Sequence, residues 1–142
     1  MKHSPVKKTK PTAEALEPLF QALGDRTRLR LLNLMADGEV CVCFFVEVLG
    51  EPQPKISRHL AYLRSAGLVS TSRDGKWISY SLAPQEHPAV RAAFDAIIAT
   101  LKDDRELQRD RVALARACCS TRVPEQLRRA PRPAVAVAVR TG

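Results

Sequence analysis

Long apolar runs are missing from this sequence, and their absence limits the classes of protein it can encode. No run approaches the length of a membrane span, and the first residues have no apolar core of the kind found in signal peptides. We therefore expect a cytoplasmic protein that makes no contact with a membrane. Only four of the 142 residues are cysteines, and in a cytosolic chain these favour thiolates over disulfides.

Positive charge is in excess, but it is concentrated outside the centre of the chain. The formal net charge is +8, with four lysines and no acid in residues 1–12 and nine arginines against three acids in residues 105–142. We therefore expect a basic disordered arm over 1–12, one domain over 13–104, and a helical extension with a flexible basic tail over 105–142. Within the domain, residues 53–76 hold five cations against Asp74 alone, which favours a nucleic-acid partner.

The stretch 53–64 predicts a short amphipathic helix with a DNA-reading face. Pro54 suits the first turn of a helix. Its aliphatic residues recur at i, i+4 and i+7, at Ile56, Leu60 and Leu63. The other face carries a cation, a hydroxyl and an amide but no carboxylate, which is the set that reaches base edges and phosphates in the major groove. An ordinary helix with a solvated face is the alternative.

Six residues of this helix are candidate DNA contacts: Gln53, Lys55, Ser57, Arg58, His59 and Tyr62. For His59, which lies on the flank of the apolar stripe, a packed and hydrogen-bonded core position is at least as good an interpretation. Tyr62 faces outward, so it could touch DNA or be a plain surface residue.

The remaining patterns predict a mainly α-helical domain with a β-hairpin. Helices are expected over about 12–23, 25–37, 43–49, 53–66 and 86–103, and 105–119 could continue as a further helix. Two alternating runs, 69–73 and 76–82, are joined by Asp74 and Gly75, the strongest short hairpin signal. Two helices with a tight turn, followed by a hairpin wing, make a winged helix-turn-helix. Arg73 and Lys76 flank the hairpin tip, where cations would contact the phosphate backbone.

Two further apolar stripes predict a homodimer. One lies over 16–23 in the first helix, and the other contains Val90, Phe94, Ile97, Ile98 and Leu101 in the 86–103 helix. Because the other elements already supply a core, we expect the N-terminal and C-terminal helices to pair two protomers. A dimer would place two reading helices about one DNA turn apart.

Five ordered segments within about 14–101 resemble the ArsR/SmtB family of metal-responsive repressors. They are ALGDRTRLRLL at 22–32, EVCVC at 39–43, QPKISRHL at 53–60, LRSAGLV at 63–69 and RDGKW at 73–77. The resemblance implies a cytoplasmic homodimer that binds operator DNA in its own promoter and leaves it when a metal or metalloid binds. The Cys-Val-Cys at 41–43 is similar to the arsenic-sensing branch, which implies trivalent arsenic or antimony as inducer and no organic cofactor.

The cysteines depart from that branch at one position. Its usual motif has a third cysteine one turn further on, where this sequence has Val46. Soft trivalent arsenic selects thiolates, and three sulfurs would suit it, so we predict ligands at Cys41 and Cys43, with Cys118 or Cys119 as the third. On a regular helix, residues two apart point about 200° apart. Cys41 and Cys43 can therefore share an ion only if the first turn unwinds or Cys41 lies before the helix.

Three alternative functions use the same thiols. A divalent sensor for cadmium, lead or zinc could use all four thiolates in a tetrahedral site. A redox-switch repressor could form a disulfide from them. A thiol-dependent arsenate-detoxifying enzyme is disfavoured because no anion-binding loop accompanies a cysteine. We therefore expect no enzymatic activity.

Overall fold

The computed structural model describes residues 9–119 and 127–134. Its elements run in the order α1 (Thr12–Leu23), α2 (Arg26–Leu34), β1 (Val40–Cys41), α3 (Val42–Leu49), α4 (Gln53–Ser65), β2 (Val69–Asp74), β3 (Trp77–Leu82), α5 (Pro88–Lys102) and α6 (Arg105–Cys119). The predicted fold of helices with a hairpin wing is confirmed. None of the helices in these described ranges is long and apolar enough to span a bilayer.

Local chemistry accounts for several helix ends, although α2 ends at Leu34, before the predicted end at 37. Asp25 caps α2, because its Oδ1 accepts a hydrogen bond of 3.0 Å from the backbone N–H of Arg28. Gly50 ends α3 in the left-handed region, with φ 67°. Pro54 lies in the first turn of α4, and the aliphatic stripe of that helix is fully buried. The chain therefore turns sharply between α3 and α4, which places them as a helix-turn-helix pair.

The wing belongs to a three-stranded antiparallel sheet in the order β1-β3-β2. Strands β2 and β3 pair from Val69 opposite Leu82 to Asp74 opposite Trp77. Strand β1 adds Cys41 opposite Ser79. The sequence did not predict β1, because two residues are too short to show a period. Its pairing ties the start of α3 to the base of the wing.

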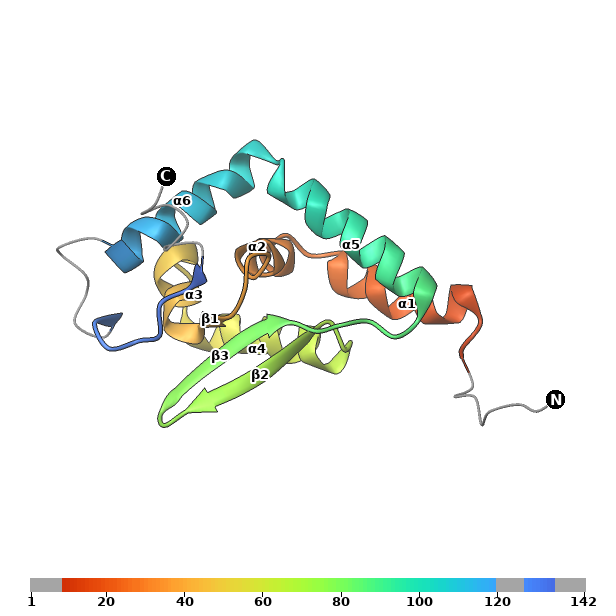
Figure 1. Cartoon of the computed structure of the whole chain (residues 1–142), viewed down its shortest axis with the longest axis horizontal. Helices are drawn as coiled ribbons and strands as arrows, with labels where there is room; N and C mark the ends of the chain where they lie inside the picture. The colour runs from red at the N-terminus through yellow and green to blue at the C-terminus, as the bar shows by residue number, and fades with distance from the viewer. Residues whose placement is uncertain (1–8, 120–126, 135–142) are drawn as a thin grey trace.

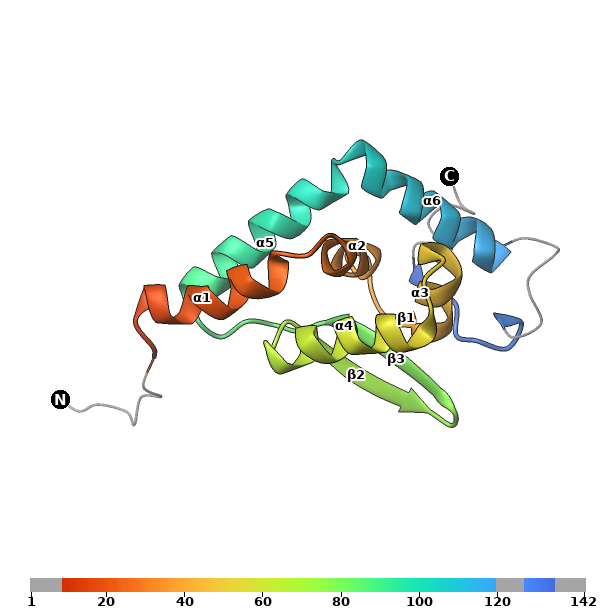
Figure 2. The same cartoon turned by 180° about the vertical axis from the view of Figure 1, so that it is seen from behind.

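The other elements lie on two opposite sides of α2. Figures 1 and 2 show α5 and α6 arching over α2, while α4 and the hairpin lie on the opposite side. Helix α4 packs against α2, α3 and β2, and α1 packs against α5 and α2. Leu31, Phe44 and Phe45 are among the fully buried side chains at the centre. The reading helix is therefore seated on the core and not on a flexible segment.

The predicted dimer stripes are partly used inside one protomer. Leu19 of α1, and Val90, Phe94 and Leu101 of α5, are buried because α5 packs against α1 and α2. The expectation that other elements supply the whole core is therefore wrong. Phe20 remains 54% exposed.

Helix α6 is held on the domain by polar contacts between residues far apart in the sequence. Arg30 makes a two-pronged ion pair with Asp110, at 2.8 and 2.9 Å. Asn33 Nδ2 donates to the carbonyl oxygen of Leu107 at 3.0 Å. Helix α6 also packs against α3. The extension thus braces the helix that begins at the Cys-Val-Cys motif.

The predicted tail differs in part from the structure. Leu127 and Ala130 are buried in the hydrophobic core, and Arg132 donates to the carbonyl oxygen of Cys118. This short segment therefore packs on the domain because its apolar side chains find a surface beside α6. The parts of the predicted arm and tail at 1–8, 120–126 and 135–142 lie outside the described residues.

Candidate nucleic-acid interface and thiol site

The outward face of α4 presents most of the predicted contact residues. Gln53, Ser57, Arg58 and Tyr62 are exposed. Lys55 is half-buried, and its Nζ lies 3.1 Å from Glu51 Oε1, so part of its charge is neutralised within the protomer. A helix with an amide, a hydroxyl and a guanidinium on its free face has the groups needed to read base edges.

His59 points toward the start of α2. Its Nδ1 lies 3.4 Å from Arg28 Nη1 and 3.9 Å from Asp25 Oδ1, and the side chain is only 16% exposed. This placement favours the packed interpretation of His59. Its contact with DNA stays a prediction.

The wing carries its two predicted cations at an exposed tip. Arg73 and Lys76 are both exposed, and Lys76 Nζ lies 5.1 Å from the centre of the Trp77 ring. The hairpin extends beside α4 on the same side of the molecule (Figure 1). The cations of the wing and the free face of α4 can therefore approach one duplex.

Cys41 and Cys43 come together because Cys41 precedes the helix. Cys41 ends β1 and is the N-cap of α3, with φ −71° and ψ 142°. Of the two geometries that allow a shared ion, the structure has the one in which Cys41 lies before the helix. The Cys43 thiol donates to Cys41 Sγ at 3.3 Å. Two sulfurs this close can bind one soft ion with a small adjustment of their side chains.

The two thiols have opposite pKa shifts. The hydrogen bond from Cys43 lowers the pKa of Cys41 to about 6, while burial opposes it; the Ser79 hydroxyl and backbone N–H groups of Val42 and Cys43 also favour the thiolate. The same hydrogen bond, together with burial, raises the pKa of Cys43. The shared hydrogen bond therefore favours the thiolate at Cys41 and the protonated thiol at Cys43.

The hydrogen bond between the two thiols predicts a low pH midpoint for thiolate formation, which Cys43→Ala should raise. In a chain with Cys118→Ala and Cys119→Ala, the ultraviolet absorbance of thiolate should rise with a first midpoint near pH 6. Adding Cys43→Ala removes the donor to Cys41, so the midpoint should move up toward the ordinary value of 9.0. A first midpoint near pH 9.0 in both proteins would contradict the effect of the Cys43 hydrogen bond on the pKa of Cys41.

A cavity of about 250 Å³ joins the thiol pair to the candidate interface. Its lining includes Cys41 and Cys43, Gln53 and Ser57 of α4, and Lys76 of the wing. Sequence reasoning missed the lining residues of β3, which are Trp77, Ile78 and Tyr80. Only the pairing of β1 with β3 brings them beside the cysteines, and no local pattern encodes that pairing.

Cys118 does not join this pair. It is buried in α6, and no group of three or more His, Cys, Asp or Glu side chains in the described part of the chain is placed to hold a metal ion. Within the described residues Cys118 does not form a three-ligand group with the pair, and its role as the third ligand stays a prediction. The side chain of Cys119 lies outside the described residues.

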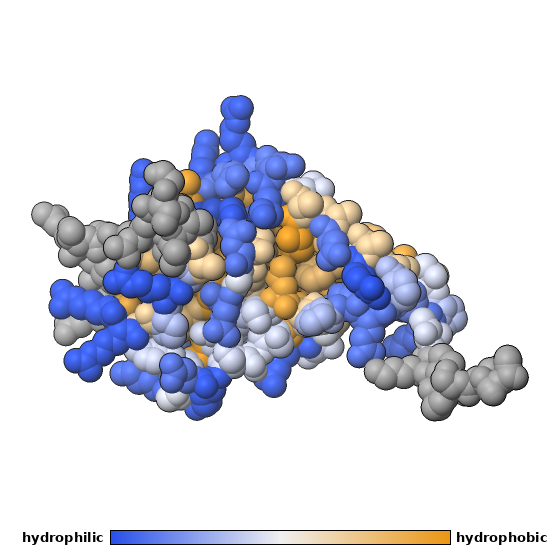
Figure 3. All heavy atoms as spheres, viewed as in Figure 1, coloured by the Kyte–Doolittle hydropathy of each residue, from blue (hydrophilic) through white to orange (hydrophobic). Residues whose placement is uncertain are grey.

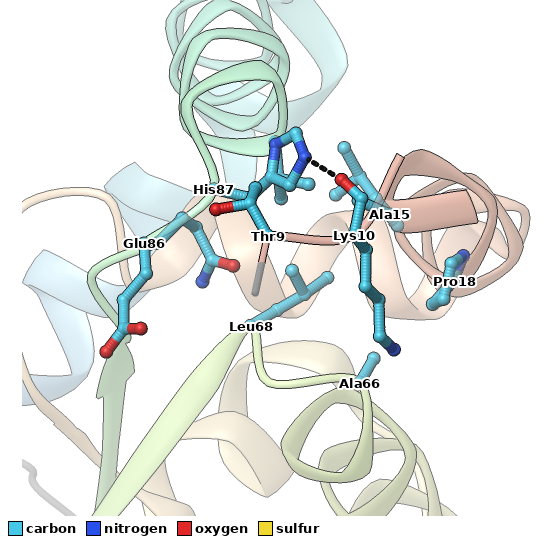
Figure 4. Close-up of a pocket in the computed structure, with 11 residues that line it drawn as sticks. Thr9, Lys10, Ala15, Pro18, Ala66, Leu68, Glu86 and His87 are labelled. Atoms are coloured by element: carbon cyan, nitrogen blue, oxygen red, sulfur yellow. Dashed lines mark hydrogen bonds between the residues drawn. The ribbon is translucent and has the colours of Figure 1, made fainter. Parts of the chain in front are cut away.

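A second cavity, of about 380 Å³, lies at the far end of the domain (Figure 4). It is lined by the start of α1, the turn after α4 and the residues that lead into α5. His87 Nδ1 accepts from the backbone N–H of Ala89, so its Nε2 is the donor to the carbonyl oxygen of Lys10 at 2.8 Å. This histidine caps α5 and holds the chain before α1, and it has no cysteine beside it among the lining residues.

Comparisons with known proteins place the chain among bacterial regulators. The family model described as bacterial regulatory protein, arsR family, matches residues 25–71. An arsenical resistance operon repressor of Escherichia coli is 49% identical over 67 residues, which are 46% of this chain and 57% of that protein. An arsenic resistance transcriptional regulator of Pseudomonas putida is 44% identical over 93 residues, which are 63% of this chain and 70% of that protein.

A solved structure supports the same fold. HlyU from Vibrio cholerae superposes with a TM-score of 0.56 and 26% sequence identity, covering 65% of this chain and 97% of that chain. The match to the E. coli repressor spans a little over half of that protein's length, 57%.

A helix-turn-helix pair with a free polar face and a cationic hairpin beside it defines a winged-helix transcription regulator. Its relatives are regulators and not enzymes. The chain belongs to the ArsR family of bacterial regulatory proteins.

Proposed function

We propose that this regulator is a repressor that binds operator DNA as a homodimer and is released when trivalent arsenic or antimony binds Cys41 and Cys43. The observation that carries the proposal is the cavity that the two sulfurs share with Gln53 and Ser57 of the reading helix. An ion bound there lies between α4 and the wing. Similarity to the arsenic-resistance regulators named above supports the choice of inducer.

The binding step needs no oxidant or reductant. Arsenite enters as As(OH)₃, and two As–O bonds are replaced by two As–S bonds to Cys41 and Cys43. The thiolate of Cys41 attacks first, and the proton held by Cys43 leaves with a hydroxide. The second hydroxide takes up one proton from solvent, so two waters are released and one hydroxyl stays on arsenic. Two thiols are sufficient for this step.

Binding at the pair is coupled to reading through α3. Cys41 is the N-cap of α3, and α3 leads through the turn at Gly50 into α4. Moving the two sulfurs onto one ion displaces the start of α3 and fills the space that Gln53 and Ser57 adjoin. The DNA-bound arrangement of α4 then becomes less favourable, and the duplex is released.

Exposed apolar side chains on α1 and α5 support the dimer. Phe20 of α1 is 54% exposed, and Ile97 and Ile98 of α5 are only partly buried. Figure 3 shows hydrophobic side chains reaching the surface along α5. Pairing these faces across a two-fold axis would bury them and place two copies of α4 to read two half-sites.

A redox switch is the second candidate, and the 3.3 Å separation of the two sulfurs favours it. Peroxide would oxidise Cys41 and Cys43 to a disulfide and be reduced to two waters. The four-thiolate site for a divalent metal has less support, because Cys118 is not placed beside the pair.

A panel of inducers separates these candidates. The probe is a labelled duplex that the wild-type chain enriches from a randomised pool, followed by fluorescence anisotropy. We expect arsenite and methylarsenite, which both react with two thiols, to release the duplex at lower concentrations than cadmium, and peroxide to leave it bound. Release by peroxide alone would identify the redox switch, and release by cadmium alone would identify a divalent sensor.

A further inference from the structure

One arginine outside the thiol site and the reading face connects three helices. Arg28 lies in the first turn of α2, where its backbone N–H donates to the capping carboxylate of Asp25. Its guanidinium reaches both α1 and α4. Neither the DNA contacts nor the inducer chemistry proposed above uses it.

Toward α1, the guanidinium caps the end of the helix. Nε donates to the carbonyl oxygen of Ala22 at 2.7 Å, and Nη2 donates to that of Gln21 at 3.1 Å. Carbonyls of the last helical turn have no partner within the helix, and a cation is favourable at that end of the helix dipole. The planar fork of arginine presents two N–H donors in a fixed geometry that matches the two carbonyls, whereas the donors of a lysine ammonium rotate freely on a flexible stem.

Toward α4, the same guanidinium lies on the reading helix. Its central carbon is 4.2 Å from the centre of the Tyr62 ring, within the range of a cation–π contact. Nη1 lies 3.4 Å from His59 Nδ1. Arg28 therefore contacts two residues of α4, His59 and Tyr62, which lie about one helical turn apart. The predicted DNA contact Arg58 is the neighbour of His59 in the sequence.

Direct packing between α1 and α4 is slight. Helix α1 packs on α5 and α2, and α4 packs on α2, α3 and β2, as Figure 2 shows. A surface hollow of about 360 Å³, lined by Pro18 and Gln21 of α1 and by Arg58 and Tyr62 of α4, separates the two helices. Arg28 makes the polar bridge beside this hollow.

We propose that Arg28 is a positioning residue for DNA reading, which fixes α4 relative to α1 and so sets the half-site separation that the dimer accepts. This inference rests on the dimer proposed above. If α1 helps to pair the protomers, the bridge from α1 to α4 determines where the two reading helices lie. One inserted base pair moves the second half-site by about 3.4 Å along the duplex, so a rigid bridge makes binding sensitive to spacing.

The test compares Arg28→Met with a matched control, Arg91→Met. Arg91 also donates through Nε and Nη2 to two backbone carbonyls, those of Gln85 and Glu86, both at 3.1 Å, and both carbonyls lie in the segment that leads into α5. The probes are the duplex enriched by the wild-type chain and versions with one or two base pairs inserted or removed between the half-sites. Anisotropy at fixed salt gives the affinity for each spacing.

We expect wild type and Arg91→Met to lose on the order of tenfold in affinity per changed base pair, the size of a lost base contact. Arg28→Met should bind the preferred spacing about tenfold more weakly, yet bind the altered spacings nearly as well, so that its profile is flat. Affinity for unrelated duplex should stay within a factor of about two, because phosphate contacts are retained. A merely structural role would lower every affinity together.

Two further measurements separate a failure to fold, a failure of the positioning role and a failure of the proposed dimer. If Arg28→Met fails to fold by circular dichroism, Arg28→Lys takes its place, since it keeps the charge but loses the fork, and it should give the same flat profile. A folded Arg28 variant with the wild-type spacing profile overturns the positioning role. Sedimentation equilibrium tests the dimer separately: a monomer on the enriched duplex overturns the dimer and the spacing role that rests on it.

Discussion

Cys41→Ala and Cys43→Ala should each abolish the release of DNA by arsenite while leaving the duplex bound. Each variant removes one of the two sulfurs that lie 3.3 Å apart, so arsenic can form only one As–S bond at the site. A soft ion held by a single thiolate is easily displaced by water and other thiols. Anisotropy of the enriched duplex during an arsenite titration should stay constant in both variants and fall in wild type.

The matched control is the double variant Cys118→Ala and Cys119→Ala, which keeps the Cys41–Cys43 pair. It should respond to arsenite as wild type does, because both sulfurs of the proposed site are retained. If this control loses the response to arsenite but keeps that to methylarsenite, a third sulfur from the C-terminal helix completes the arsenite site. If only the control loses both responses, the site lies at the C-terminus and the proposal is wrong.

Arg58→Ala combined with Ser57→Ala should remove most of the sequence preference of the reading helix. Both side chains are exposed on the free face of α4, and neither packs in the core. Each lost base or phosphate contact should cost on the order of 1–3 kcal/mol in specific binding. The measurement is the ratio of affinities for the enriched duplex and an unrelated duplex of the same length.

Arg109→Ala controls for the change in charge. Arg109 is exposed on α6, which lies on the opposite side of the molecule from α4 (Figure 1). It should leave the affinity ratio unchanged, with at most a small uniform loss from the lower net charge. An unchanged ratio in the Arg58 and Ser57 double variant would show that another surface reads the bases.

Local patterns predicted the winged helix well because its signals are local. The Asp74-Gly75 turn between two alternating runs fixes the hairpin, and a stripe at i, i+4 and i+7 fixes the buried side of α4. Asp25 stands at the start of the helix expected over about 25–37 and is the N-cap of α2. Each of these features depends on residues within a few positions of one another.

The candidate site was less predictable because long-range pairings build it. The helical period left two geometries open for Cys41 and Cys43, and the pairing of Cys41 with Ser79 across β1 and β3 decides between them. The same pairing brings Trp77 into the cavity. Likewise, the docking of α6 rests on Arg30 and Asp110, which lie 80 positions apart, and no periodicity relates two such residues.

Intrinsic fluorescence gives the most direct test of the Cys41–Cys43 site, because the chain has one tryptophan and it lines the cavity with both cysteines. Arsenite added to wild type should change the emission of Trp77 and saturate at one ion per protomer. The same change should appear in the Cys118 and Cys119 double variant and be absent from Cys41→Ala and Cys43→Ala. A full change that persists in Cys41→Ala, or no change in wild type while arsenite still releases the duplex, would place the inducer elsewhere and contradict the account.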